Sequence, residues 1–198
     1  MSGPSHAEET SRGLPTTVVV ASDEDSLAAT IQQIISTETF RVYTSTDARG
    51  VEVAGASKNV IALAAGISEG LGYGDNARAA LVCRGAAEIT RLGEALDCGG
   101  EAFSGLSGIG DLVATCTSTH SRNHKVGYQI GQGETLEEIL SSSEKVAEGV
   151  ETTRSMHQLA EKISVELPIT SEVYRVLFEN KPPRQAVGDL MGRELKRE

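Results

Sequence analysis

Two long helical patterns in the middle of the chain place the strongest limit on how it can fold. Few β-branched residues and no proline interrupt residues 50–70 and 75–97, so each stretch is expected to form one long helix. Weaker helical patterns follow, punctuated by prolines, at 134–143, 149–164, 169–178 and 183–197. From Asp47 onward the sequence therefore predicts a mainly α-helical domain over residues 47–198.

Residues 1–46 have a different pattern. The β-branched run 15–22 predicts a buried strand, an amphipathic helix follows, and 40–46 predicts a second strand. Two strands cannot bury a sheet, so this β/α unit is expected to be the end of a larger α/β domain. Its uncovered strand edge is expected to favour association.

Charge and composition exclude several classes of protein. With 28 acidic against 18 basic residues the net charge is −10, and no basic stripe is present, which argues against a nucleic-acid partner. The longest apolar run, 60–67, is too short to span a membrane, and the polar N-terminus shows no secretion signal. Cys83, Cys98 and Cys116 form no CxxC motif, so we expect buried free thiols in a reducing cytoplasm.

Lys58 is the only charged residue in the middle of its side of the helix predicted at 50–70. A helical wheel places an apolar stripe about 80° wide on another side, formed by Val53, Ala56, Val60, Leu63 and Ile67. The neighbours of Lys58 are small, so a ligand can approach it closely. A lysine that snorkels out of a helix contact and a lysine that transfers protons are both compatible with this pattern. Asn59 is more simply explained as a polar group satisfied within the protein.

Two glycine-rich runs, 70–75 and 105–111, have some likeness to a nucleotide-binding loop. Neither follows a predicted strand, and the second has the order G-x-x-G-x-G rather than G-x-G-x-x-G, so both are expected to be turns. Asp75 and Asp111 end these runs and are placed to cap the helices that follow. Asp111 could instead hold a substrate hydroxyl or orient Lys58.

Arg122 and Asn123 form a second polar centre. They fit a helix cap with a surface ion pair, and they equally fit a guanidinium-plus-amide cradle for a substrate phosphate. His120 and His124 flank the pair without a third ligand at metal spacing, so no metal site is expected.

Five segments in unbroken order along the chain resemble bacterial-type NAD(P)-dependent glycerol-3-phosphate dehydrogenase. They are SGPSHA at 2–7, the Lys-Asn helix region at 55–85, GLSGIGDLVATCTSTHSRN at 105–123, VAEGVETT at 146–153 and LPITSEVYRVL at 167–177. The resemblance implies a helical substrate domain of the 6-phosphogluconate-dehydrogenase-like C-terminal type, preceded by the β/α remnant of a Rossmann domain. It also implies the reversible reduction of dihydroxyacetone phosphate to sn-glycerol 3-phosphate by NAD(P)H, which feeds phospholipid synthesis.

The resemblance also implies roles for individual residues. Lys58 matches the active-site lysine that exchanges a proton with the oxygen at C2 of the substrate. The positions that match substrate contacts are Gly3, Ser5, Lys58, Asp111, Ser121, Arg122 and Asn123. The positions that match contacts with the nicotinamide cofactor are Ala7, Arg122, Val146 and Glu148.

The chain also departs from the family. The glycine-rich Rossmann fingerprint and a second substrate lysine have no counterpart here, so the sequence is expected to be a C-terminal portion that is inactive alone. His6 and His120 stand where Phe and Gln are more common, and we expect little effect from either. A homodimer is a possible assembly.

Two other functions fit parts of the pattern. Other β-hydroxyacid dehydrogenases also place a Lys-Asn pair on a helix, although the Ser121–Asn123 trio favours a phosphate ester over a plain acid. A helical domain of this kind could also act without catalysis, as an oligomerisation or phosphometabolite-binding module.

Overall fold

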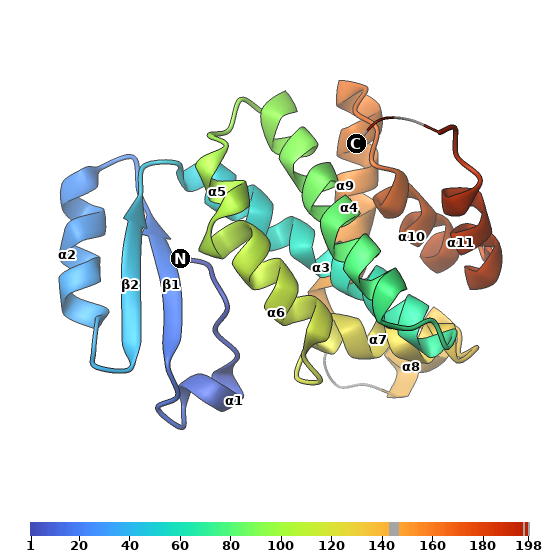
Figure 1. Cartoon of the computed structure of the whole chain (residues 1–198), viewed down its shortest axis with the longest axis horizontal. Helices are drawn as coiled ribbons and strands as arrows, with labels where there is room; N and C mark the ends of the chain where they lie inside the picture. The colour runs from blue at the N-terminus through green and yellow to red at the C-terminus, as the bar shows by residue number, and fades with distance from the viewer. Residues whose placement is uncertain (143–146, 196, 198) are drawn as a thin grey trace.

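A computed structural model describes residues 1–142, 147–195 and 197 of the chain. A small β/α unit lies at one end, and a larger group of helices forms the rest (Figure 1). The mainly helical fold expected from the sequence is confirmed.

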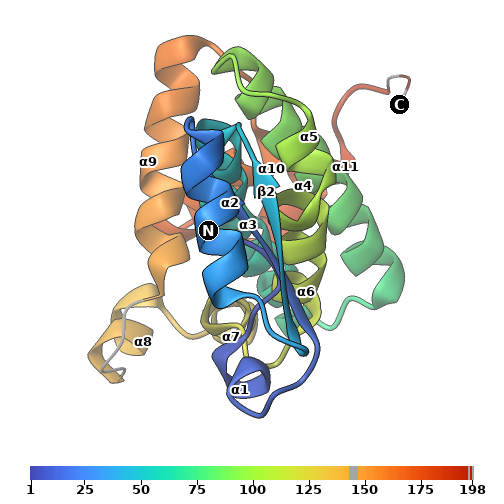
Figure 2. The same cartoon turned by 90° about the vertical axis from the view of Figure 1, so that its left-hand side faces the viewer.

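The β/α unit is formed by two parallel strands and the helix that connects them. Strand β1 (Thr16–Ala21) pairs in register with β2 (Phe40–Ser45), and α2 (Asp25–Ile35) packs on one face of the pair (Figures 1 and 2). The other face of β1 contacts the helical part, where Val19 packs with Val51 and Ala102. Contacts on both faces therefore bury most of β1, whereas Val42 is the only buried residue of β2, and Ser2 pairs with Val19 along one edge of β1.

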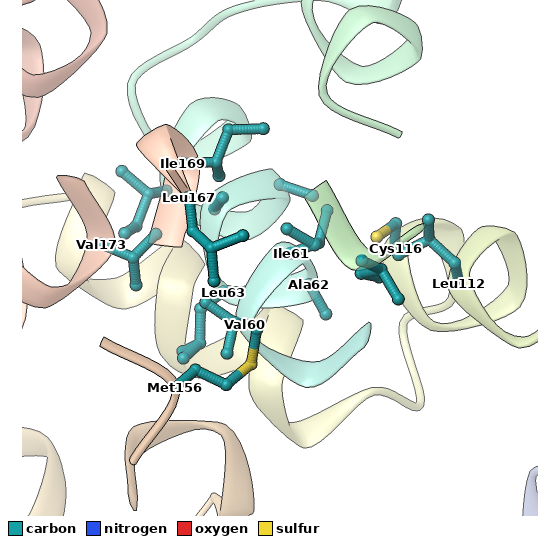
Figure 3. Packing of buried hydrophobic residues seen from close by; sticks show 14 of the residues in the cluster. Val60, Ile61, Ala62, Leu63, Leu112, Cys116, Met156, Leu167, Ile169 and Val173 are labelled. Carbon is teal, nitrogen blue, oxygen red and sulfur yellow. The ribbon is translucent and has the colours of Figure 1, made fainter. Parts of the chain in front are cut away.

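Helix α3 (Ala48–Gly70) is the centre of the helical part. It contacts α4 (Asp75–Ala95), α6 (Asp111–Thr117), α7 (Arg122–Gly131) and α9 (Glu148–Ile163). Figure 3 shows Val60, Ile61 and Leu63 of α3 among side chains from α6, α9 and the start of α10 (Pro168–Phe178). The expected one-sided apolar stripe is therefore wrong, because α3 is surrounded by other helices: Ala62 and Ala65 are buried, whereas Ala56 is exposed.

Glycines allow α3 and α7 to cross in backbone contact. A Cβ added at Gly66 would overlap the carbonyl oxygen of His124, and one at Gly127 would overlap that of Leu63. Any larger residue at either position would push the helices apart.

Several short helices were not expected from the sequence. The run 105–111 forms a π-helical turn, η1 (Leu106–Gly110), that leads directly into α6 instead of a plain turn. The other unexpected helices are α1 (Ala7–Thr10), α5 (Glu101–Ser104) and α7. They have few apolar residues at helical spacing, so periodicity did not reveal them.

The remaining helices follow the sequence patterns closely. They include α8 (Leu136–Ser142), α9, α10 and α11 (Pro183–Met191), although α11 ends before the predicted limit at 197. The three cysteines are free, but only Cys116 is buried, and burial raises the pKa of its thiol to about 12. Cys83 is exposed on α4, which corrects the expectation of three buried thiols.

Candidate functional site

Lys58 and Asp111 form an ion pair between α3 and the start of α6. The Lys58 ammonium donates a hydrogen bond to Oδ2 of Asp111. The carboxylate is almost fully buried, with 5% of its side chain exposed, whereas 20% of the Lys58 side chain reaches solvent. An ammonium has three N–H donors, so Lys58 can hold Asp111 and still offer donors to a ligand.

Asp111 is also the acceptor for the N-terminal segment. The Gly3 N–H donates to Oδ2 over 3.3 Å, and the Ser2 hydroxyl lies 3.4 Å from the same oxygen. The Thr115 hydroxyl, one helical turn further along α6, lies 3.2 Å from Oδ1. The carboxylate therefore joins α3, α6 and residues 2–3 at one point.

The helix-capping role expected for the two aspartates is wrong. Gly110 and Gly74 occupy the N-cap positions of α6 and α4, and neither helix has a side-chain cap. The Asp111 carboxylate is engaged by Lys58, and Asp75 pairs with Arg78 on its own helix. The contact with Lys58, one of the alternatives considered for Asp111, is present in the structure.

The turn at residues 2–5 is held against β1 by a glycine in an unusual conformation. Gly3 has φ +140°, and a Cβ there would lie 2.9 Å from the Cα of Val18. The Ser5 hydroxyl donates to the Gly3 carbonyl over 3.0 Å and closes the turn. This close packing aims the Gly3 N–H at Asp111, whereas Ser5 itself is exposed.

Residues Ser121 and Asn123 are buried at the start of α7. Ser121 is the N-cap, and its hydroxyl accepts from the His124 N–H over 3.2 Å. The Asn123 amide donates to Oδ1 of Asn59 and accepts from the Gly149 N–H, both over 2.9 Å. These bonds connect α7 to α3 and α9, and they confirm that Asn59 is satisfied within the protein.

Arg122 and Glu148 face each other on the surface next to these buried groups. Their Nη2 and Oε1 atoms are 3.7 Å apart, with 57% and 73% of the side chains exposed. Arg122 therefore offers N–H donors and Glu148 offers carboxylate acceptors at one place on the surface. Ala7 is also exposed, at the start of α1, and Val146 lies outside the described residues.

The flanking histidines point to different neighbours. The rings of His120 and His6 lie 5.9 Å apart, so the segments 2–7 and 120–123 meet. His124 is buried, with Nε2 3.2 Å from a Glu69 carboxylate oxygen.

Two residues that contact Asp111 were not expected from the sequence. Thr115 follows Asp111 by four residues, which is the spacing of neighbours on a helix, but the bounds of the helix after Asp111 were not predicted. Ser2 gave no signal, because its contact depends on the path of the N-terminal segment along β1.

Comparisons with known proteins match this arrangement. Residues 47–188 match a family model described as the C-terminus of NAD-dependent glycerol-3-phosphate dehydrogenase. The chain is 57% identical over 198 residues to glycerol-3-phosphate dehydrogenase (NAD(P)+) of Syntrophotalea carbinolica, covering 100% of this chain and 60% of the relative. The corresponding protein of Geobacter sulfurreducens is 55% identical, with 100% of this chain and 59% of the relative covered.

A solved structure shares the fold. The crystal structure of glycerol-3-phosphate dehydrogenase from Coxiella burnetii superimposes with a TM-score of 0.94 and 42% sequence identity. The match covers 97% of this chain and 59% of that one. The chain thus spans about 60% of the length of the relatives it matches.

Proposed function

The chain belongs to the family of NAD-dependent glycerol-3-phosphate dehydrogenase C-termini, and we propose that it supplies the substrate domain of such an enzyme. The reaction is the reversible reduction of dihydroxyacetone phosphate to sn-glycerol 3-phosphate with NAD(P)H. The observation that carries this proposal is the Lys58–Asp111 pair, in which a buried carboxylate holds a partly exposed ammonium.

Lys58 is the proton donor in the direction of reduction. Its ammonium donates to the carbonyl oxygen at C2 and transfers a proton as that oxygen gains charge. Asp111 holds the amine in place through Oδ2, and the Gly3 N–H and Thr115 hydroxyl hold Asp111 in turn. The bound nicotinamide supplies the hydride.

The start of α7 binds the substrate phosphate. The first N–H groups of a helix lack intrahelical acceptors, and the exposed Arg122 guanidinium stands at the same end. Ser121 and Asn123 fix this end to the Lys58 helix through the bond between Asn123 and Asn59. The proposed substrate-binding set is Gly3, Ser5, Lys58, Asp111, Ser121, Arg122 and Asn123.

Arg122 and Glu148 hold the nicotinamide carboxamide, with Ala7 beside them. Arg122 donates to the carboxamide oxygen, and Glu148 accepts from its NH2 group. Such contacts position the ring but bind little of the dinucleotide. The turn after β1 is acidic at Asp23, Glu24 and Asp25, which disfavours a pyrophosphate at the start of α2. We therefore expect the 198-residue chain alone not to turn over.

The domain assignment and the cellular setting are part of the same proposal. Residues 1–46 belong to the NAD(P)-binding part and 47–198 form the substrate domain; the start of the family match at residue 47 supports this boundary. Three free cysteines support a cytoplasmic location. No helix in the described part of the chain has the length and apolar composition needed to cross a membrane. A homodimer is the proposed assembly.

Calorimetric titration of the chain with small ligands tests the substrate assignment. Glycerol 3-phosphate is expected to bind, with 3-hydroxyisobutyrate and glycerol at least tenfold weaker, because both lack the phosphate. Arg122→Ala should weaken glycerol 3-phosphate binding by a similar factor, whereas Arg154→Ala, an exposed arginine on α9, should leave it unchanged. Tighter binding of 3-hydroxyisobutyrate would favour a β-hydroxyacid dehydrogenase instead.

Turnover is tested in a chimera. The chain is joined to the part of the Syntrophotalea carbinolica relative that it does not match, and oxidation of NADH by dihydroxyacetone phosphate is followed. A chimera that folds and binds both ligands without turnover would point to a non-catalytic phosphometabolite-binding module.

A further inference from the structure

A cavity lies far from Lys58, at the end of the molecule opposite the β/α unit. It has a volume of about 810 Å³ and is bounded by α4, α10, α11 and the end of α3 (Figure 1). Ser68 lines it, ten residues after Lys58 on α3, which is about 15 Å along the helix axis. None of the proposed substrate or cofactor residues lines this cavity.

Its inner wall is apolar. Three neighbouring helices contribute this surface, through Ala77, Ala80, Leu81, Ile169, Val187 and Leu190. Apolar surface that faces a solvent-filled cavity gains free energy when a ligand covers it. Such a wall therefore favours a ligand with an apolar body.

The rim of the cavity is positively charged although the chain carries a net charge of −10. Five arginines line it: Arg84, Arg91, Arg184, Arg193 and Arg197. Arg91 and Arg184 donate to backbone carbonyls, and neither forms an ion pair with a described residue, although the charge of Arg91 acts on the nearby Glu88. Arg84 makes no hydrogen bond or ion pair with any described residue.

The carboxylates at the cavity do little to offset this charge. Glu88 is buried in the lining, and its carboxylate accepts from the N–H groups of Ile169 and Thr170 at the start of α10. Glu194 is the other carboxylate in the lining, and the ion pair of Arg193 is with Glu166. Guanidinium groups in excess over carboxylates favour an anionic head group.

We propose that this cavity binds a small anionic amphiphile, with its apolar body against α4 and α11 and its anionic head at the arginine rim. The volume falls in the range of about 300–1,000 Å³ that is typical of small-molecule sites, which favours a free small molecule over a protein segment. The anionic group is a phosphate, carboxylate or sulfonate, since guanidinium pairs with each of them.

Three probes separate the contributions of head and body. Decyl phosphate, kept below its micelle concentration, is titrated into the chain by calorimetry, with decyl maltoside and inorganic phosphate as comparisons. We expect decyl phosphate to bind at least tenfold more tightly than either, and to raise the midpoint of thermal unfolding. Equal binding of decyl maltoside would remove the role of the arginines, and equal binding of inorganic phosphate would remove the role of the apolar wall; either result overturns the proposal.

Two matched pairs of variants locate the site. Ala80→Trp fills the cavity from α4, whereas Ala79→Trp changes an exposed residue on the same helix that does not line it. We expect the first to weaken decyl phosphate binding at least tenfold and the second to leave it within twofold. Equal effects of the two variants would place the ligand elsewhere.

The second pair of variants removes the positive charge of one arginine at the rim and leaves the apolar wall of the cavity unchanged. Arg84→Gln should weaken binding about fivefold to tenfold, and Arg78→Gln, on the same helix outside the cavity, should leave it within twofold. Unchanged binding in Arg84→Gln together with Arg184→Gln would overturn the proposal, whatever the folding behaviour of Ala80→Trp.

Discussion

The side chains of Asn59 and Asn123 share a buried hydrogen bond of 2.9 Å that joins the Lys58 helix to the proposed phosphate-binding end of α7. The second bond of Asn123, to the Gly149 N–H, adds the start of α9, where Glu148 stands. Three helices that carry candidate residues are therefore aligned by one amide. Displacing it should move the proton donor and the anion site relative to each other.

Asn123→Ala is expected to destabilise the chain by about 1–3 kcal/mol, because it leaves the buried Gly149 N–H without an acceptor. Unfolding in urea measures this cost, with exposed Asn76→Ala on α4 as the control. A double-mutant cycle with Asn59→Ala should show a coupling energy of at least about 0.5 kcal/mol. Additive effects would mean that the bond between the two side chains contributes nothing.

Lys58→Met is expected to lower kcat of the chimera at least about 100-fold, because the variant retains the length of the side chain and loses the proton donor. Binding of glycerol 3-phosphate should fall much less. The control is Lys162→Met, an exposed lysine at the end of α9. A Lys58→Met chimera with unchanged kcat would remove Lys58 from the proton transfer.

Gly3→Ala and Gly13→Ala separate backbone conformation from close packing. Both glycines have positive φ, +140° and +71°, but only a Cβ at Gly3 would contact the backbone of β1, while no atom lies within 4 Å of one at Gly13. Gly13→Ala should therefore cost about 1 kcal/mol and Gly3→Ala clearly more. Urea unfolding of both variants provides the comparison, and equal costs would contradict the close approach of residue 3 to Val18.

Glu88 predicts a pH dependence of stability. Burial raises the pKa of this carboxyl group above its ordinary value of 4.5, although N–H bonds from Ile169 and Thr170 oppose the shift. A raised pKa means that the folded state binds the proton more tightly, so this stabilisation is present below pH 4.5 and is lost as pH rises through the higher folded value. Glu88→Gln lacks the ionisation, and its stability relative to the parent chain should therefore increase with pH.

Urea unfolding of Glu88→Gln and the parent chain between pH 4 and 7.5 measures this difference. Glu94→Gln, an exposed residue on the same helix, should show no comparable trend. A difference for Glu88→Gln that stays constant or shrinks as pH rises would show that the N–H bonds outweigh burial.

Much of the fold is predictable from local patterns. The two strands, the long helices and the boundary near Asp47 follow from β-branched runs, apolar spacing and prolines, which act within a few residues of one another. The surroundings of α3 do not follow from its own sequence. The apolar residues of α3 do not mark one buried side, because helices on several sides bury small residues such as Ala62 as fully as Leu63.

The site is less predictable, because its contacts join residues far apart in the chain. Lys58 and Asp111 are 53 positions apart, and the pattern around Lys58 favoured snorkelling over proton transfer. The π-helical turn before Asp111 aims its carboxylate at Lys58, and a glycine-rich run gives no local sign of that geometry. From the residues alone, orienting Lys58 was one of several roles open for Asp111, and the resemblance to a family placed both residues in one site.

The glycine crossing of α3 and α7 has a consequence for substrate length. Backbone contact at Gly66 and Gly127 sets the shortest separation of α3 and α7, and the bond between Asn59 and Asn123 sets the spacing between the Lys58 helix and the start of α7. If that spacing separates the reacting carbonyl from the phosphate, a substrate with one more carbon between these groups cannot engage both ends. Selection for longer substrates would then have to alter the 118–121 loop, since the two helices cannot move apart without losing their contact.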